Sequence, residues 1–342
     1  ARLLSPLQDF AEVTSQTEYR VDPLTGRVAI VGLNLAGKRT VLYSETDRER
    51  VNALAERTRP GCFFCPERVE SVTPRYPEDL IPNGGRLRRG DSLLFPNLFP
   101  LTDVHAVIAL GSQHFRWLDQ FDVELLTDGL ALAAEFVTTM SKTPDAPKNW
   151  AICCNYLPPG GASIVHPHIQ ILGSSIPLTT AARELDSARQ YREAQGRCYF
   201  DDLAQREEDA ADRFVARRKA TRWMTAFAPR GNTEIIGICD EASRIDQLGE
   251  DHIRGLAEGL NAGLRAYHDL KYSTFNFCLY SAPYGEGHPD DFRVYASLVS
   301  RQSLVEDYRS DDYFLQKMLG TEILVDSPEE IAKRLRDQED DQ

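Results

Sequence analysis

Two periodicities of apolar residues, one typical of strands and one of helices, divide the chain into predicted elements. In residues 18–33, two alternating runs flank the proline and glycine of "DPLTG", a pattern typical of a hairpin. The stretch Leu93–Leu110 predicts two further strands, and leucines and alanines at helical spacing predict a helix from about Asp122 to Met140. A strand is expected at "NWAICCNYL", residues 149–157, followed by a glycine-rich loop and a strand that contains two histidines.

The histidine-bearing stretch "GGASIVHPHIQILGSS", residues 160–175, sets His166, His168 and Gln170 at alternate positions. A strand repeats every two residues, so these side chains are expected on one face, opposite the core. The glycines upstream let backbone N–H groups approach an anion without obstruction by Cβ atoms. Because Pro167 cannot donate to a ladder, the strand is expected at a sheet edge, open to a ligand. The same pattern is also compatible with a half-buried strand that binds nothing.

A pattern in the first part of the chain returns in the second. Residues 98–136 and 226–267 both contain an aromatic residue with proline, an apolar strand, an Asp-Gln pair and a helix rich in alanine and leucine. The second copy has Tyr295 and Ser297 roughly where the first has its two histidines. We therefore predict a duplicated chain in which only the first half kept its chemistry.

The predicted halves are residues 1–177 and 178–342, the second with a degenerate active site. Residues 178–222 are dense in arginine, glutamate, aspartate and alanine, with apolar residues at helical intervals. This segment is expected to be a helical connector with solvated faces.

The bulk composition excludes several classes of function. Hydrophobic residues make up 42% of the 342 residues and charged residues 27%, which is typical of a soluble globular protein. There is no apolar run long enough to span a membrane and no apolar signal core near residue 1, so a cytoplasmic location is expected. The net charge of −13 argues against binding to nucleic acid or to an anionic membrane.

The seven cysteines do not have the spacing of a disulfide framework. Only Cys62 and Cys65 are spaced as metal ligands commonly are. A Cys-x-x-Cys pair also occurs in redox motifs, but those lie where a strand meets a helix, whereas Pro66 and an acidic stretch follow here.

The histidine strand and the segments around it share their order with a known family. "GASIVHPHIQ" resembles the active-site strand of the galactose-1-phosphate uridylyltransferase family, the nucleotidyltransferase branch of the histidine-triad superfamily. "YRVDPLTGRVAIV", "CFFCPERVE", "LLFPNLFPL", "HAVIALGSQHFRWLDQF" and "SPEEIAKRLRD" are similar to its other segments, over roughly the whole chain. The resemblance implies an α+β, duplicated histidine-triad-like fold with antiparallel sheets flanked by helices, and a homodimer.

The resemblance also implies a metal site. In the family, a cysteine pair, a histidine in the turn after a long strand and the first histidine of the motif bind one ion; these correspond to Cys62, Cys65, His114 and His166. Two thiolates and two imidazoles complete the tetrahedral coordination of zinc, so the ion is expected to be structural. The alternative is that these four residues bind no metal.

With His166 on the metal, the resemblance leaves His168 as the nucleophile. Neutral imidazole, with a pKa of about 6.5, can attack phosphorus near pH 7 without a separate base. Attack on an α-phosphorus forms a nucleotidyl-histidine, which a second phosphate then accepts. Gln170, Ser163 and the Gly161 amide are expected to stabilise the charge that develops. Glutamine at position 170, where hydrolases of the superfamily have histidine, indicates transfer to phosphate rather than to water.

Further residues are assigned to the substrate by the resemblance. Asn97 and Phe99 match a segment that holds the ribose and stacks on the base, and Asn155 matches an active-site asparagine. Lys38 and Arg39 correspond to a basic cluster that meets the sugar phosphate. Phe99 could equally be a core aromatic, and the basic pair could be a solvated surface.

Two departures from the family change the expected function. Some members carry a second metal on histidines of the second half; the matching residues here are Tyr280, Tyr295 and Ser297, so no second metal is expected. Gln316 and Lys317 stand where the galactose enzymes have a tyrosine and a glutamate that read the hexose. Losing that carboxylate would remove a partner for a sugar hydroxyl, which places galactose in doubt.

We therefore predict a zinc-stabilised nucleotidyltransferase. It would pass a nucleoside monophosphate, with UMP as the first choice, through His168 between a nucleotide sugar and a sugar-1-phosphate-like acceptor. The alternative within enzymes is a phosphorylase or hydrolase of a dinucleotide or nucleotide sugar. The alternative from another class is a non-catalytic nucleotide sensor, although a sensor has no need of the nucleophile.

Overall fold

The computed structural model describes residues 2–32, 44–285, 290–307 and 310–340. The helices are α2 (Arg48–Thr58), α3 (Val69–Val72), α4 (Val123–Met140), α5 (Thr179–Gln195), α6 (Tyr199–Ala210), α7 (Glu250–Asp269), α8 (Phe314–Leu319) and α9 (Pro328–Asp340). The strands are β1 (Arg2–Ser5), β2 (Ala11–Thr14), β3 (Glu18–Val21), β4 (Val28–Val31), β5 (Leu87–Arg89), β6 (Ser92–Pro96), β7 (Val104–Ala109), β8 (Asn149–Tyr156), β9 (His168–Ser174), β10 (Phe214–Arg218), β11 (Thr221–Thr225), β12 (Ile235–Cys239), β13 (Phe275–Tyr280), β14 (Tyr295–Ser300) and β15 (Glu322–Leu324).

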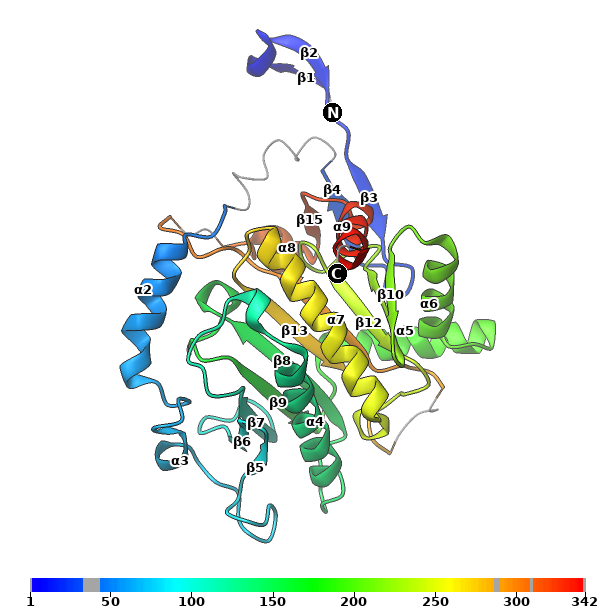
Figure 1. Ribbon diagram of the computed structural model, residues 1–342. Coiled ribbons are helices and arrows are strands. Elements are labelled where there is room, and N and C mark those ends of the chain that lie inside the picture. The colour runs from blue at the N-terminus through cyan, green and yellow to red at the C-terminus, as the bar shows by residue number, and fades with distance from the viewer. Residues whose placement is uncertain (1, 33–43, 286–289, 308–309, 341–342) are drawn as a thin grey trace.

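A ten-stranded antiparallel sheet forms the centre of the molecule. Its order is β10-β11-β12-β14-β13-β8-β9-β7-β6-β5. The long helices α4 and α7 lie side by side on one face of it (Figure 1). Their apolar stripes form one continuous core with the strands beneath them, from Leu125 and Phe136 in α4 to Leu256 and Leu264 in α7.

The sheet order confirms the predicted duplication. The sequence β5-β6-β7-α4-β8-β9 returns as β10-β11-β12-α7-β13-β14, and the two sets run outward in opposite directions from the centre. They meet at the β8–β13 pair, where Cys153 lies opposite Cys278 with 3.4 Å between the sulfur atoms. The fold is therefore α+β, with two similar halves that share one sheet.

The long helix of the first half begins and ends as its sequence predicts. The side chain of Asp122 accepts a hydrogen bond from the N–H of Leu125 and so caps the first turn of α4, which ends at Met140. Ten residues of this helix are buried, so packing on the sheet rather than intrinsic propensity holds it.

The prediction for residues 178–222 was partly wrong. α5 and α6 are helices, but residues 214–225 form β10 and β11 at the sheet edge. Their arginines suggested a solvated face; in the fold, the guanidinium of Arg222 donates to Asp240 at 2.8 Å, so the charge is paired rather than solvated. All five residues of β11 are buried. The chain division at residue 177 itself stays a prediction.

A small sheet joins the two ends of the chain. β3 and β4 form the predicted hairpin, and β15 from the C-terminal region pairs in parallel with β4. Arg20 of β3 holds both carboxylate oxygens of Glu329 in α9 at 2.9 Å. Each end thus completes the structure of the other.

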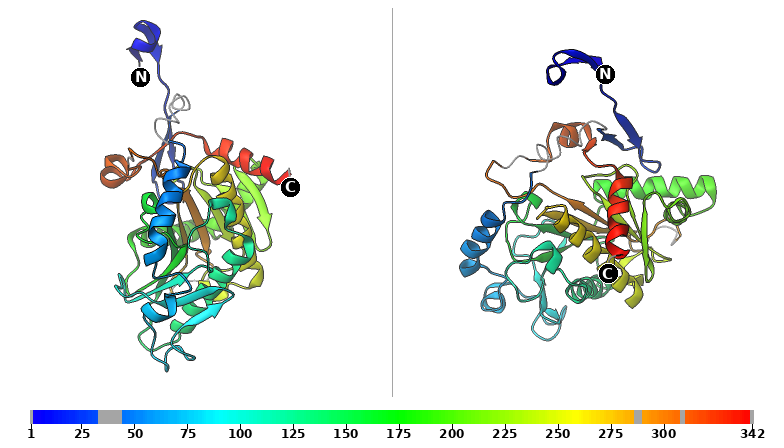
Figure 2. Two further views of the ribbon diagram at one scale, coloured as in Figure 1. Left: turned by 60° about the vertical axis from the view of Figure 1, so that its left-hand side comes forward. Right: turned by 45° about the horizontal axis from the view of Figure 1, so that its top comes forward.

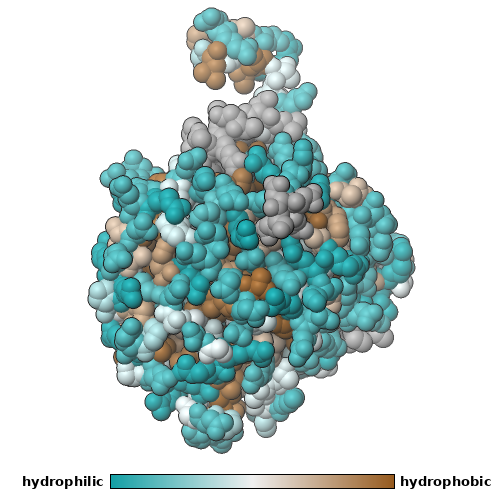
Figure 3. Space-filling model, viewed as in Figure 1, coloured by the Kyte–Doolittle hydropathy of each residue, from teal (hydrophilic) through white to brown (hydrophobic). Residues whose placement is uncertain are grey.

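The first hairpin, β1–β2, stands away from the rest of the molecule (Figures 1 and 2). It carries the exposed side chains of Leu3, Leu4, Leu7 and Phe10, visible as apolar patches in Figure 3. Within the described ranges, no helix has the length and apolar character needed to cross a bilayer.

Candidate functional site

The histidine strand lies inside the sheet rather than at its edge. β9 pairs with β7 on one side and with β8 on the other, so the prediction of an edge strand was wrong. β9 begins at His168, which places Pro167 just before the ladder, where its missing N–H is not needed. The pairing with β8 starts at Gln170, so the first two residues of β9 are paired on the β7 side alone.

The predicted separation of faces holds within β9. Ile169 and Ile171 belong to the core under α4, and His168 and Gln170 project from the other face. His166 precedes the strand and is fully buried. A smaller apolar cluster, which includes Phe64 from the cysteine loop, covers this second face near the two histidines.

The four predicted metal ligands come together. The ligand atoms of Cys62, Cys65, His114 and His166 all lie within 4.8 Å of one another, and all four residues are buried. Cys65 Sγ lies 3.4 Å from His114 Nδ1 and 3.7 Å from His166 Nδ1. Sulfur and nitrogen ligands of a tetrahedral zinc ion are separated by about 3.6 Å, so these residues fit a Cys2His2 metal site.

The surroundings of the cluster suit neutral imidazole ligands. His166 Nε2 is 3.1 Å from the carbonyl oxygen of Gly111, and His114 Nε2 is 3.0 Å from the hydroxyl of Thr58. Such partners on the second ring nitrogen turn Nδ1 toward the metal. Burial lowers the pKa of His166 to about 4 and also lowers that of His114. Burial raises the pKa of the Cys65 thiol to about 12, so ionisation of this thiol needs a cation.

His168 is oriented by the backbone. Its Nδ1 lies 2.9 Å from the carbonyl oxygen of His166, so Nδ1 carries the hydrogen and Nε2 keeps a lone pair. The residue is buried, and this burial lowers the pKa of the imidazole. The ring of Phe64 meets it edge-on at 5.4 Å between centroids. The side chain is thus a neutral, fixed imidazole.

Gln170 is held by a histidine that the sequence analysis missed. His105 of β7 is buried, and its Nδ1 accepts the N–H of Leu101 at 3.1 Å. Its Nε2 therefore carries the hydrogen and donates to Gln170 Oε1 at 3.1 Å. With its oxygen engaged, Gln170 presents its NH2 group to the site. A polar residue inside the apolar run "VHAVIAL" was the signal that could have identified His105.

Asn97 lies beside His105, and Phe99 is not a core residue. Asn97 Nδ2 lies 3.2 Å from His105 Nε2, and its Oδ1 accepts the N–H of Phe99 at 2.9 Å. Phe99 is 77% exposed, which leaves its ring available to a planar ligand.

The glycine loop lies beside Asn155, as the sequence order suggested. Gly161 has φ +88°, a conformation that favours glycine, and a Cβ there would approach the Asn155 amide at 3.8 Å. Asn155 Oδ1 accepts a hydrogen bond from Asn276 of the second half at 2.7 Å. Ser163 is exposed in the loop that follows. Lys38 and Arg39 lie outside the described residues, so their assignment stays a prediction.

The second half carries a different set of side chains on the equivalent face. Cys278 pairs with Ser297 as Cys153 pairs with Gln170. By this register, Tyr295 corresponds to His168 and Ser297 to Gln170, which shifts the expected correspondence by two residues. Ser297 Oγ donates to Glu234 at 2.6 Å, which repeats the contact between Gln170 and His105 with other groups.

The two residues expected at the sugar are engaged within their own segment. Gln316 Nε2 donates to Glu322 Oε1 at 2.7 Å, and Lys317 Nζ pairs with Asp312 at 2.7 Å. Neither is therefore a free substitute for the hexose-reading residues of the galactose enzymes.

Comparisons with known proteins agree with this architecture. No protein-family model matches the chain. An uncharacterized protein of Archaeoglobus fulgidus is 31% identical over 320 residues, 94% of this chain and 92% of that protein. A GalT-like protein of Arabidopsis thaliana has a TM-score of 0.70 at 19% identity and covers 93% of this chain and 98% of its own.

Two enzymes of known structure have the same fold. An ADP-glucose phosphorylase of Arabidopsis thaliana, with bound ADP-glucose, has a TM-score of 0.70 at 20% identity over 94% of this chain and 99% of its own. A uridylyltransferase has a TM-score of 0.67 at 18% identity over 94% and 97%. The chain therefore belongs to one family with the Archaeoglobus fulgidus protein, and it has the fold shared by the GalT-like protein, the ADP-glucose phosphorylase and the uridylyltransferase.

Proposed function

We propose that the protein is a nucleotidyltransferase or phosphorylase that carries a nucleoside monophosphate on His168. The observation that carries the proposal is the hydrogen bond between His168 Nδ1 and the His166 carbonyl oxygen. This bond fixes a neutral imidazole with a lone pair on Nε2, which is the state that a nucleophile toward phosphorus requires.

In the proposed first step, His168 Nε2 attacks the α-phosphorus of a nucleoside diphosphate compound. A P–N bond forms as the P–O bond to the leaving phosphate breaks, and the nucleotidyl-imidazolium keeps its Nδ1 hydrogen on the His166 carbonyl. The acceptor phosphate then attacks the same phosphorus and restores the neutral imidazole. No oxidant, reductant or further base is needed.

Donors around His168 would stabilise the equatorial phosphoryl oxygens. The Gln170 NH2 group is directed by the hydrogen bond that its oxygen accepts from His105. The Gly161 amide and the Ser163 hydroxyl are the other proposed donors, while Asn97, Phe99 and Asn155 would hold the nucleoside. Most of the catalytic effect in such a transfer comes from donors fixed before the reaction.

Zinc is the proposed metal of Cys62, Cys65, His114 and His166. It would supply a structural crosslink between the cysteine loop and the backbone just before β9, because four protein ligands leave no position for substrate. Its loss would move His166, whose carbonyl orients the nucleophile.

The acceptor remains a choice between a sugar phosphate and inorganic phosphate. The engagement of Gln316 and Lys317 with Glu322 and Asp312 favours an acceptor other than galactose 1-phosphate. A phosphorylase is therefore the second candidate, in which inorganic phosphate takes the nucleotide and a nucleoside diphosphate is released.

The test is to incubate the protein with UDP-glucose, ADP-glucose and GDP-mannose and to measure its intact mass under denaturing, non-acidic conditions. We expect a gain equal to one nucleoside monophosphate with one of these donors, absent in His168→Ala. Adding glucose 1-phosphate, galactose 1-phosphate or inorganic phosphate should then discharge the adduct and identify the acceptor. Absence of an adduct and of any turnover across the panel would reject the proposal.

A further inference from the structure

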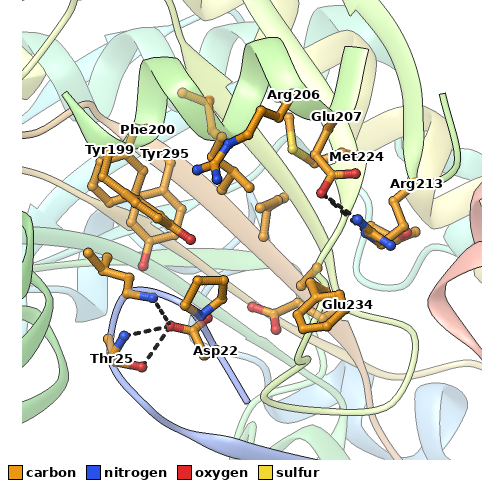
Figure 4. Close-up of a pocket in the computed structure, with 18 of the residues that line it drawn as sticks. Asp22, Thr25, Tyr199, Phe200, Arg206, Glu207, Arg213, Met224, Glu234 and Tyr295 are labelled. Carbon is orange, nitrogen blue, oxygen red and sulfur yellow. Dashed lines mark hydrogen bonds and ion pairs between the residues drawn. The ribbon is translucent and has the colours of Figure 1, made fainter. Parts of the chain in front are cut away.

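The second half contains a cavity on the face that corresponds to the candidate active face of the first. Its volume is about 340 Å³. The side chains of Met224, Ile236 and Ile238 form its floor on β11 and β12, while α6 and the turn between β3 and β4 close it from the other side. Figure 4 shows the rings of Tyr199, Phe200 and Tyr295 grouped at one side of the cavity.

The cavity is mostly apolar, but it contains polar atoms with unused hydrogen-bonding capacity. Glu207 is 6% exposed; its Oε1 accepts from Arg213 at 2.8 Å, whereas its Oε2 has no hydrogen-bond partner among the residues described. Figure 4 places this ion pair across the cavity from the three rings. A buried carboxylate oxygen without a donor is uncommon in native proteins.

Two further groups in the cavity have hydrogen-bonding capacity that the fold does not use. Arg230 donates to the Tyr295 hydroxyl and forms ion pairs with Glu184 and Glu234, yet its Nη1 atom is buried without a partner in the described part of the chain. Tyr199 is 4% exposed, and its hydroxyl makes no hydrogen bond to any residue that the structure describes. The cavity thus encloses a carboxylate oxygen and a guanidinium N–H without partners, together with the Tyr199 hydroxyl, while Arg206, whose Nε donates to the Asp202 carbonyl oxygen, adds its terminal guanidinium nitrogens.

The number of spare groups limits the class of ligand. A hexose presents hydroxyl groups all around its ring, and the apolar floor of Met224, Ile236 and Ile238 would leave several of them unpaired. A flat heteroaromatic molecule needs few hydrogen bonds, because most of its surface can stack on aromatic rings. Purine and pyrimidine bases carry donors and acceptors at several positions around a flat ring, which suits Glu207 Oε2 on one side of the cavity and Arg230, beside Tyr295, on the other.

We propose that this cavity is a binding site for a nucleobase or nucleoside, separate from His168. The planes of Tyr199 and Phe200 stand at 84° to each other, so the ligand ring would stack on one and meet the other edge-on. Its donor would bond to Glu207 Oε2, and its acceptors would face Arg230 Nη1 and the Tyr199 hydroxyl. The site does not require the proposed nucleotidyl transfer.

The experiment is calorimetric titration of the full-length protein with adenine, guanine, uracil, adenosine and uridine. We expect saturable binding of at least one of them at one site per chain. Tyr199→Phe removes only the hydroxyl and should weaken binding by about tenfold. The same variant should unfold at about the same temperature, because this hydroxyl makes no hydrogen bond to a described residue, whereas a purely structural role would lower that temperature.

Controls separate this cavity from the candidate active site. Ala210→Trp adds an indole at the exposed end of α6, where Ala210 lines the cavity, and should abolish binding. Gln205→Trp adds the same group to the same helix away from the cavity and should not. His168→Ala should also bind normally. The proposal is overturned if no base or nucleoside binds, if only hexoses bind, or if Ala210→Trp binds as the unmodified protein does.

Discussion

The face of β7 and β9 and the face of β12 and β14 have the same backbone plan but bury opposite kinds of chemistry. The first buries imidazoles and thiols, with His105, His114, His166 and His168 beside Cys62 and Cys65. The second buries carboxylates that pair with arginines: Glu184 and Glu234 with Arg230, and Glu207 with Arg213. Groups of the first kind can be neutral near pH 7, whereas those of the second are charged and need one another.

This difference is consistent with the proposed placement of the nucleophile in the first half. A neutral imidazole can be buried without a counter-charge and still offer a lone pair. Arg230 instead lies over the rings of Tyr280 and Tyr295, at 4.9 and 5.5 Å from their centroids, and pairs with two carboxylates. The duplicated scaffold thus places side chains of different charge at equivalent positions of the two halves.

The largest expected effect separates the two faces directly. His168→Ala should lower the rate of nucleotidyl transfer by at least about a thousandfold, because it removes the nucleophile. Ser297→Ala, at the counterpart of Gln170, should change the rate less than about twofold. Initial rates with the donor identified by the mass experiment measure both. Equal losses in the two variants would contradict the assignment of chemistry to the first half.

Removing a metal ligand should lower the unfolding free energy more than changing a cysteine outside the metal site. Cys65→Ser should lose the bound ion and at least about 3 kcal/mol of unfolding free energy, because a structural zinc site contributes directly to folding. Cys153→Ser, at the junction of the halves, should keep one zinc per chain. Elemental analysis and denaturant unfolding measure the two quantities. A folded, untagged protein free of zinc would refute the metal assignment.

One buried carboxylate of the second half, that of Glu322, should give the opposite pH response from a buried imidazole. Burial raises the pKa of Glu322 to about 7, above its ordinary value of 4.5. Its stabilising protonated form is favoured at low pH, so this contribution is complete below pH 4.5 and is lost as pH rises through 7. The loss amounts to roughly 3 kcal/mol. Glu322→Gln should therefore flatten the stability profile between pH 4.5 and 8; an unchanged profile would exclude Glu322 as its source.

The smallest expected effect concerns His105. His105→Phe keeps a flat ring but removes the hydrogen bond to Gln170, which should lower kcat by about tenfold with little change in KM for the nucleotide donor. His105→Asn, which can still donate, should recover part of the rate. A rise in KM alone would assign His105 to substrate binding rather than to the positioning of Gln170.

The sequence could predict the parts of the site that depend on local order. The hairpin, α4 and the alternation of His168 and Gln170 follow from short-range patterns, and the resemblance brought together Cys62 and His166, more than a hundred positions apart. The alternation of side chains along a strand shows which face each one is on, but it does not show which strands pair on either side. The sequence analysis therefore placed β9 at a sheet edge. Arg222 suggested solvent because its partner, Asp240, lies just after a different strand, β12.

The pairing of β4 with β15 bears on how the chain is made. The ribosome releases β3 and β4 long before residues 322–324 are synthesised, so the small sheet cannot be completed during most of synthesis. Until then, β4 has an open edge, and Arg20 has no Glu329 to hold. The strands and helix of the first half are synthesised early, but β4 and Arg20 gain these partners only after β15 and α9 have emerged. A nascent chain stalled before β15 should therefore be more sensitive to proteases near residues 18–31 than the released protein.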